Sequence, residues 1–99
     1  MVGTVSDEYL NKARFALRRS SGDAAVDGEI TDLIKQCRAD LVRMGVAEDV
    51  ATDETNELVL GCVRCFLRWQ FGIDGIDAER CHEEYLELAD NLRKSQEAS

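Results

Sequence analysis

Apolar residues recur along the chain at the spacing of an α-helix, in four separate segments. The clearest is 27–44, whose apolar residues follow the i, i+3, i+4, i+7 order of one helix face: Ile30, Leu33, Ile34, Cys37, Leu41 and Met44. The chain has no proline, so glycines and capping residues must mark the helix ends. We expect four helices, at about 6–19, 27–44, 54–71 and 78–94.

Short polar side chains and glycines stand at the expected helix ends. The Ser6 hydroxyl can cap the first helix, and Asp77 can cap the fourth. Gly45 follows the second helix in the position of a C-terminal cap. Phe15 lies off the apolar line of the first helix, and the segment 46–53 is predicted to be a loop.

The third predicted helix, 54–71, is apolar around most of its circumference. Its other residues form a narrow stripe: Glu57, Gly61, Arg64 and Arg68. A surface helix needs an apolar arc of only about 100°. We therefore expect an all-α fold, a small bundle of four helices with the third helix central or also facing another subunit. Gly61 costs about 1 kcal/mol relative to alanine inside a helix, which predicts a neighbouring backbone close to it.

The length of the chain bounds its organisation. Residues 1–99 have room for one hydrophobic core, so we expect a single domain. Apolar residues make up 44% and charged residues 32%, a balance that supports a packed interior. No apolar run approaches the roughly 20 residues that cross a bilayer, and no export signal is visible. We expect a chain made in the cytosol, with no membrane contact and with reduced thiols.

The formal net charge is -8, from 20 acidic and 12 basic residues. Affinity for nucleic acids comes largely from neutralising phosphates with Lys and Arg, so this balance disfavours a DNA-binding module. The negative net charge is still compatible with a protein that surrounds DNA without binding it, because acidic side chains repel the DNA phosphates.

Cysteines are the first candidates for chemistry. Cys62 and Cys65 form a CxxC pair, which with Cys37, Cys81 or His82 would supply four zinc ligands. Structural zinc sites usually take such a pair from a tight turn, whereas these thiols fall in the middle of a predicted helix. Cysteine on an apolar helix face behaves as a small hydrophobic residue. We favour core packing over a zinc-stabilised domain, and we expect no cofactor.

Catalytic arrangements are not evident in the sequence. His82 is the single histidine, and its neighbours Glu83 and Glu84 lie on a face predicted to be solvated, which indicates a surface residue. No glycine-rich phosphate loop and no serine in a nucleophile elbow occur. We therefore expect a protein that is not an enzyme.

Two stretches together resemble a known family. These are GEITDLIKQCRADLVRMG at 28–45 and RWQFGIDG at 68–75, the second running into Ala78, Glu79, Arg80, Tyr85, Leu88 and Leu92. The pattern resembles the small head-tail connector proteins of tailed bacteriophages, often described as DNA-packaging proteins. The similarity covers nearly the whole chain.

The resemblance implies an all-helical virion protein that assembles into a ring, commonly of about twelve copies. Such a ring lies in the neck of the particle, between the portal and the next neck or tail component, such as a stopper protein. It would extend the DNA channel, and DNA would pass through without specific binding. The chain would then be located in the virion, and in the host cytoplasm during assembly.

The charge pattern supplies candidate ring contacts. Residues 1–21 sum to +2 and residues 45–57 to -5. A closed ring needs a heterologous interface, in which two different patches meet. We expect the basic end of the first helix to meet the acidic loop of the adjacent subunit, through Arg18 and Arg19 on one side and Glu48, Asp49, Asp53 and Glu54 on the other.

Candidate docking residues for another neck protein lie near two helix ends. Trp69 and Phe71 close the third helix, as core residues or as anchors in a partner's pocket. Arg93 and Lys94 lie at the end of the fourth helix. The alternative to a connector is a small acidic helical regulatory or protein-binding module, which would share the composition and the absence of catalytic motifs.

Overall fold

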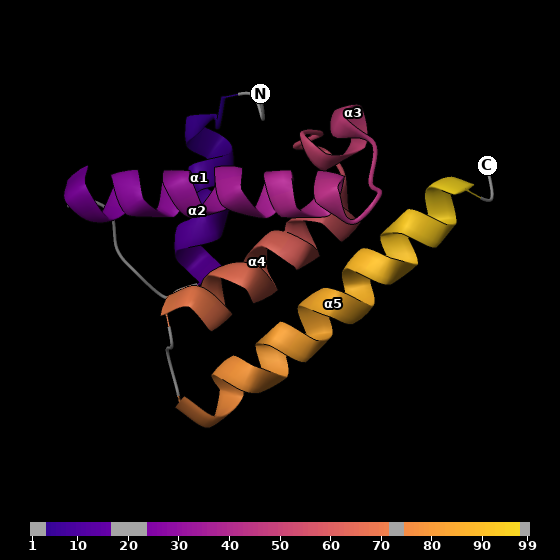
Figure 1. The fold of residues 1–99 in the computed structure, drawn as a ribbon. Coiled ribbons are helices and arrows are strands. Elements are labelled where there is room, and N and C mark those ends of the chain that lie inside the picture. Colours follow the sequence, from indigo (N-terminus) through magenta and orange to yellow (C-terminus); the bar gives the residue numbers. More distant parts are fainter. Residues whose placement is uncertain (1–3, 17–23, 72–74, 98–99) are drawn as a thin grey trace.

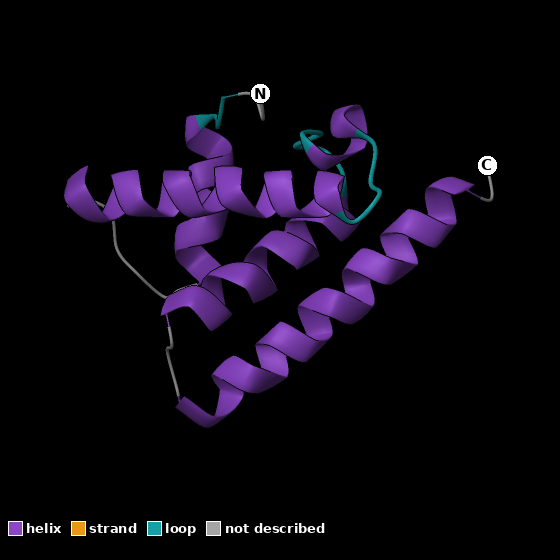
Figure 2. Cartoon of the chain, viewed as in Figure 1, coloured by secondary structure: helices purple, strands orange, loops and turns teal. Residues whose placement is uncertain are grey.

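The computed structural model of the chain describes residues 4–16, 24–71 and 75–97. All regular structure in these ranges is helical (Figures 1 and 2). The helices are α1 (Asp7–Ala16), α2 (Ala24–Arg43), α3 (Glu48–Ala51), α4 (Glu57–Phe71) and α5 (Gly75–Glu97). The predicted all-α class is therefore confirmed for the described residues.

Helix α4 packs against three others, α1, α2 and α5. In Figure 1, α5 runs along one side of α4, while α1 and α2 lie on the other side. The body measures 41 × 31 × 19 Å along its principal axes. Helix α5 has 23 residues, so at about 1.5 Å per residue it spans most of the longest dimension.

Several helix ends differ from the sequence-based expectation. Helices α2 and α5 each begin three residues earlier than predicted, at Ala24 and Gly75, so Asp77 lies inside a helix instead of capping it. Residues 17–19 of the first predicted helix lie outside the described residues. The predicted loop 46–53 contains the one-turn helix α3, which makes five described helices instead of four.

The start of α4 was predicted at residue 54 and lies at Glu57. The reason is Asn56, whose side-chain oxygen accepts hydrogen bonds from the backbone N–H groups of Leu58, at 2.9 Å, and Val59, at 3.2 Å. Asparagine is among the best residues at an N-cap, since it satisfies donors that the first helical turn leaves unpaired. The sequence reasoning overlooked this capping signal.

Two of the predicted caps are confirmed. The N–H of Tyr9 donates to the Ser6 hydroxyl at 3.1 Å. Gly45 has φ +108°, and its N–H donates to the carbonyl of Val42 at 3.0 Å. The N–H of Val46 reaches back to the carbonyl of Leu41, also at 3.0 Å. This pair of bonds is a Schellman motif, which requires a left-handed residue where glycine carries no Cβ penalty.

The core forms where α1, α2, α4 and α5 meet. Its fully buried apolar side chains include Ala13, Ile30, Ile34, Cys37, Leu41, Val59, Cys62, Val63 and Leu67. Most apolar residues of α4 are buried, as its wide apolar arc predicted, with the exception of Leu58. None of the described helices combines the length and apolar character needed to span a bilayer.

The environment of Gly61 differs from the prediction of a close helix backbone. The nearest atom to a Cβ added there is a side-chain methyl, Cδ1 of Leu88, at 3.6 Å. That distance is ordinary van der Waals contact. Gly61 is therefore not required by close packing of two backbones.

Candidate interaction surfaces

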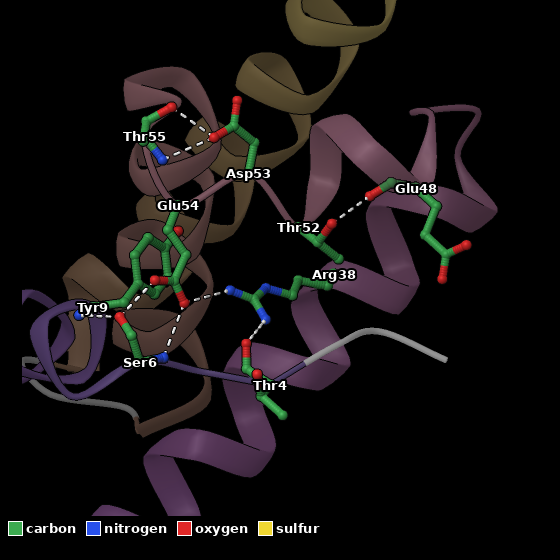
Figure 3. A network of polar contacts seen from close by, with 9 residues as sticks. All are labelled: Thr4, Ser6, Tyr9, Arg38, Glu48, Thr52, Asp53, Glu54 and Thr55. Atoms are coloured by element: carbon green, nitrogen blue, oxygen red, sulfur yellow. Dashed lines mark hydrogen bonds and ion pairs between the residues drawn. The ribbon is translucent and has the colours of Figure 1, made fainter.

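A buried arginine joins three parts of the chain (Figure 3). The side chain of Arg38, on α2, is 1% exposed. Its guanidinium donates to the carbonyl oxygen of Thr4 at 3.0 Å and to the carboxylate of Glu54 at 3.4 Å, and it lies 5.4 Å from the centre of the Tyr9 ring. A buried charge is tolerated when it is paired and hydrogen-bonded, and both conditions hold here.

Glu54 completes this network from the segment before α4. Its carboxylate accepts hydrogen bonds from the backbone N–H of Ser6, at 2.9 Å, and from the Ser6 hydroxyl. Partial burial acts to raise the pKa of Glu54, but the bonds from Ser6 and Arg38 outweigh it and hold the pKa below its ordinary value. Glu54, selected from sequence as a subunit contact, thus bonds within its own chain.

The other predicted acidic contacts have different environments. Asp53 accepts hydrogen bonds from the N–H and the hydroxyl of Thr55, at 2.9 and 2.6 Å, and these bonds lower its pKa. Glu48 and Asp49 are exposed on α3. Their predicted partners, Arg18 and Arg19, lie outside the described residues.

Trp69 is part of an aromatic cluster between α4 and α5. Its ring stacks on His82 with centroids 3.9 Å apart and planes 10° from parallel. It also meets Phe66 edge-on at 5.6 Å, and Phe66 lies 5.3 Å from Tyr85. The partly buried Trp69 therefore packs against the core, while the side chain of Phe71, the other predicted anchor, is not described.

The stacking of His82 on Trp69 was missed at the sequence level, where His82 is expected at the surface. The side chain is instead partly buried. Helix spacing on α5 alone gives no signal for this contact. It depends on the antiparallel register of α4 and α5, which places residue 82 beside residue 69.

The basic residues near the end of α5 make local ion pairs. Arg93 and Lys94 each lie 2.9 Å from a carboxylate oxygen of Asp90. Arg93 also packs over the turn after α2, where its Cδ would lie 2.9 Å from a Cβ added to Gly45. Exposed pairs of this kind contribute little to stability. Lys94 is the more exposed of the two, at 64% of its side-chain area.

All four cysteines are free and buried. Burial raises the pKa of Cys62 to about 12 and that of Cys65 to about 11. Cys65 Sγ lies 3.7 Å from a carboxylate oxygen of Glu84. Among the described side chains, no cluster of three or more His, Cys, Asp or Glu residues is arranged to hold a metal ion. In this structure the thiols fill the core.

Four large apolar side chains are exposed instead of packed. Phe15 on α1 is 80% exposed, and Leu58, Leu86 and Val42 are exposed by 48%, 45% and 38%. A surface hollow of about 250 Å³ lies on α5, lined by Glu84, Glu87, Leu88 and Asn91. Sequence reasoning noted that Phe15 falls outside the apolar line of its helix, but it gave no sign of the hollow.

In its described part the chain is a small all-helical protein. Comparisons of the chain with protein-family models, with curated proteins and with solved structures found no match.

Proposed function

We propose that this chain is a structural subunit of a bacteriophage neck, a head-tail connector that forms a ring between the portal and the next neck or tail component. The resemblance of residues 28–45 and 68–92 to that family supplies the specific assignment. The helical fold and the acidic composition are compatible with it. The ring, of about twelve copies, would extend the channel through which DNA leaves the capsid.

The observation that carries an assembling role is the exposure of Phe15. A phenylalanine that keeps 80% of its surface in water forgoes most of the stabilisation that burial would give. Aromatic residues are enriched in the cores of protein interfaces. Meanwhile the buried Arg38 bonds to Glu54 and so links α2 to the segment before α4.

We further propose that α4 is the central helix of the assembling unit. It contacts α5 on one side and α1 and α2 on the other, so both outer layers of the subunit are positioned on the same helix. The outer face of α5 carries four exposed carboxylates: Glu79, Glu83, Glu84 and Glu87. These acids favour contact with a basic protein surface, or repulsion of DNA, over binding to phosphates.

For the contact between ring subunits, we retain the basic residues predicted from sequence and revise the acidic ones. We propose that Arg18 and Arg19, which follow α1 in the sequence, meet an acidic surface of the next subunit. Glu54 is only partly exposed, whereas Glu48, Asp49 and Asp53 are exposed, so these three are the better candidates in the loop. Lys94 is the more exposed of the two basic residues proposed to dock on another neck protein.

A mass measurement with and without portal protein tests the proposed function. The chain alone should associate only weakly by light scattering, and mixing with the portal of the same phage should give ring-shaped assemblies in electron micrographs. Weak retention of duplex DNA in a low-salt gel shift should accompany this result. A stable dimer that does not bind the portal would overturn the proposal and favour the alternative, a small helical regulatory or protein-binding module.

A further inference from the structure

We infer that Phe15 of one subunit inserts into the α5 hollow of a second copy of this chain. This contact adds a second acidic surface, on α5, to the loop contact proposed above, and so it rests on the proposed function as a ring subunit. The two halves of the contact are an exposed aromatic side chain on α1 and a hollow on α5 that is lined by one leucine, two glutamates and an asparagine.

The size of the hollow suits the side chain. Its volume is about 250 Å³. A cavity of about 150 Å³ is enough to hold a benzene ring. Leu88 supplies the apolar part of the lining and is itself partly buried against Gly61 on α4. A phenyl ring that enters the hollow would therefore rest on a side chain already held by the core.

Charge at the two surfaces is complementary. Lys12 is exposed one turn before Phe15, and residues three apart on a helix are neighbours on the same face. Glu84 and Glu87 line the hollow. The nearest acid on that face of α1, Glu8, lies about two turns from Phe15. With Phe15 inserted, Lys12 would lie beside the glutamates of the hollow.

The placement of the two surfaces suits a repeating contact. Helices α1 and α5 both pack on α4, and they lie on opposite sides of it in Figure 1. A contact between two different patches is heterologous, and it generates a ring when its rotation closes. A second copy of this chain carries both halves of the contact, Phe15 with Lys12 on α1 and the acidic hollow on α5. Each copy can therefore bind a neighbour through either half.

Substitutions on each side test the contact in equilibrium sedimentation of the full chain. Phe15→Ser should weaken self-association about thirtyfold, as expected for the loss of one well-buried phenyl group. Lys12→Glu and Glu87→Lys should each weaken it by a smaller factor. The double variant Lys12→Glu with Glu87→Lys should recover most of the loss, because the charges then match again.

Two control variants make the same kinds of substitution, apolar to serine and glutamate to lysine, at positions of α5 outside the hollow. Leu86→Ser removes an exposed apolar side chain from α5 outside the hollow, and Glu79→Lys reverses an exposed charge on the same helix. Both should leave self-association unchanged. All of the substituted residues are exposed, and circular dichroism would verify that each variant retains its helices.

Cross-linking identifies the contact directly. A zero-length carbodiimide applied to a mixture of ¹⁴N- and ¹⁵N-labelled chains should join Lys12 of one isotope to Glu84 or Glu87 of the other, as read by mass spectrometry. Wild-type chain that stays monomeric at about 1 mM, or that associates equally well as Phe15→Ser, would overturn the inference. Rings on portals that persist in Phe15→Ser would overturn this contact while sparing the proposed function. Self-association through Phe15 without portal binding would support this contact and overturn the proposed function.

Discussion

The hydroxyl of Tyr85 donates a 2.7 Å hydrogen bond to the carboxylate of Asp40 and thereby ties α5 to α2. The other oxygen of Asp40 accepts from the exposed Arg43. The second tyrosine, Tyr9, has a buried hydroxyl for which the described residues supply no hydrogen-bond partner. Of the two buried tyrosine hydroxyls, that of Tyr85 is therefore hydrogen-bonded and that of Tyr9 is not, within the described residues.

Replacing each tyrosine by phenylalanine should change stability in opposite directions. Tyr85→Phe removes a bond to a charged acceptor and should lower the free energy of unfolding by about 1–2 kcal/mol. Tyr9→Phe removes a buried hydroxyl that gains nothing in return, and it should be neutral or stabilising by up to about 1 kcal/mol. Urea unfolding monitored by circular dichroism measures both. Equal destabilisation by the two substitutions would contradict this account.

Alkaline pH should unfold the chain as its phenols ionise. Burial raises the pKa of Tyr9 to about 12. Burial, the Cys37 thiol and the Asp40 carboxylate raise the pKa of Tyr85 well above its ordinary value. Because both pKa values are higher in the folded state, this contribution to stability is complete below pH 10, the ordinary tyrosine value, and is lost as the pH rises toward 12.

Absorbance at 295 nm follows this titration directly, since the chain has two tyrosines. The tyrosinate signal should stay small at pH 10 and then rise together with the loss of helical circular dichroism. A signal that reaches half its final value at pH 10 while the helices persist would show that the phenols are accessible to solvent.

The glycines predict a second pair of opposite effects. Gly61→Ala and Gly28→Ala should each raise the free energy of unfolding by about 0.5–1 kcal/mol, because alanine favours a helix and the new methyl meets Leu88 at 3.6 Å or open space. Gly45→Ala should lower it by about 1–2 kcal/mol, since φ +108° is strained for any residue with a Cβ.

Thermal unfolding separates these variants. In a domain of this size about 1 kcal/mol moves Tm by 4–8 °C. Destabilisation by Gly61→Ala would indicate that the α4–α5 packing near Leu88 is tighter than the structure places it.

Features of the fold that depend on residues close in sequence were predicted, and features that depend on distant contacts were not. The Gly45 cap and the buried face of α2 depend on neighbouring residues, and both were predicted. Helix α3 has four residues, fewer than periodicity can reveal. The roles of Glu54 and His82 depend on Ser6 and Trp69, which are distant in sequence. The hollow on α5 likewise becomes visible only once the helices are placed, so Glu87 was not among the subunit contacts predicted from sequence.

Removing the acceptor charge of Glu54 should destabilise the chain. Glu54→Gln weakens the bonds from Ser6 and from the buried Arg38, and it should lower the free energy of unfolding by about 1–3 kcal/mol at neutral pH. Since the pKa of Glu54 is lowered by folding, the stabilisation is present above its ordinary value and fades as the pH falls through the folded-state pKa.

The difference between wild type and Glu54→Gln should therefore shrink below about pH 4, as measured by urea unfolding at several pH values. Glu29→Gln, an exposed glutamate on α2, serves as the matched control and should stay within about 0.5 kcal/mol of wild type. A Glu54→Gln variant as stable as this control would contradict the network in Figure 3.

The stacked pair of Trp69 and His82 gives a spectroscopic test of the α4–α5 register. His82→Ala uncovers one face of the only tryptophan, so the fluorescence emission should shift to longer wavelength. Loss of the stacked ring should also cost about 0.5–1.5 kcal/mol of stability. Glu83→Ala, at the next and exposed position of α5, should leave the emission unchanged. Equal spectra for the two variants would mean that residue 82 does not face Trp69, and the register that also positions Leu88 beside Gly61 would be wrong.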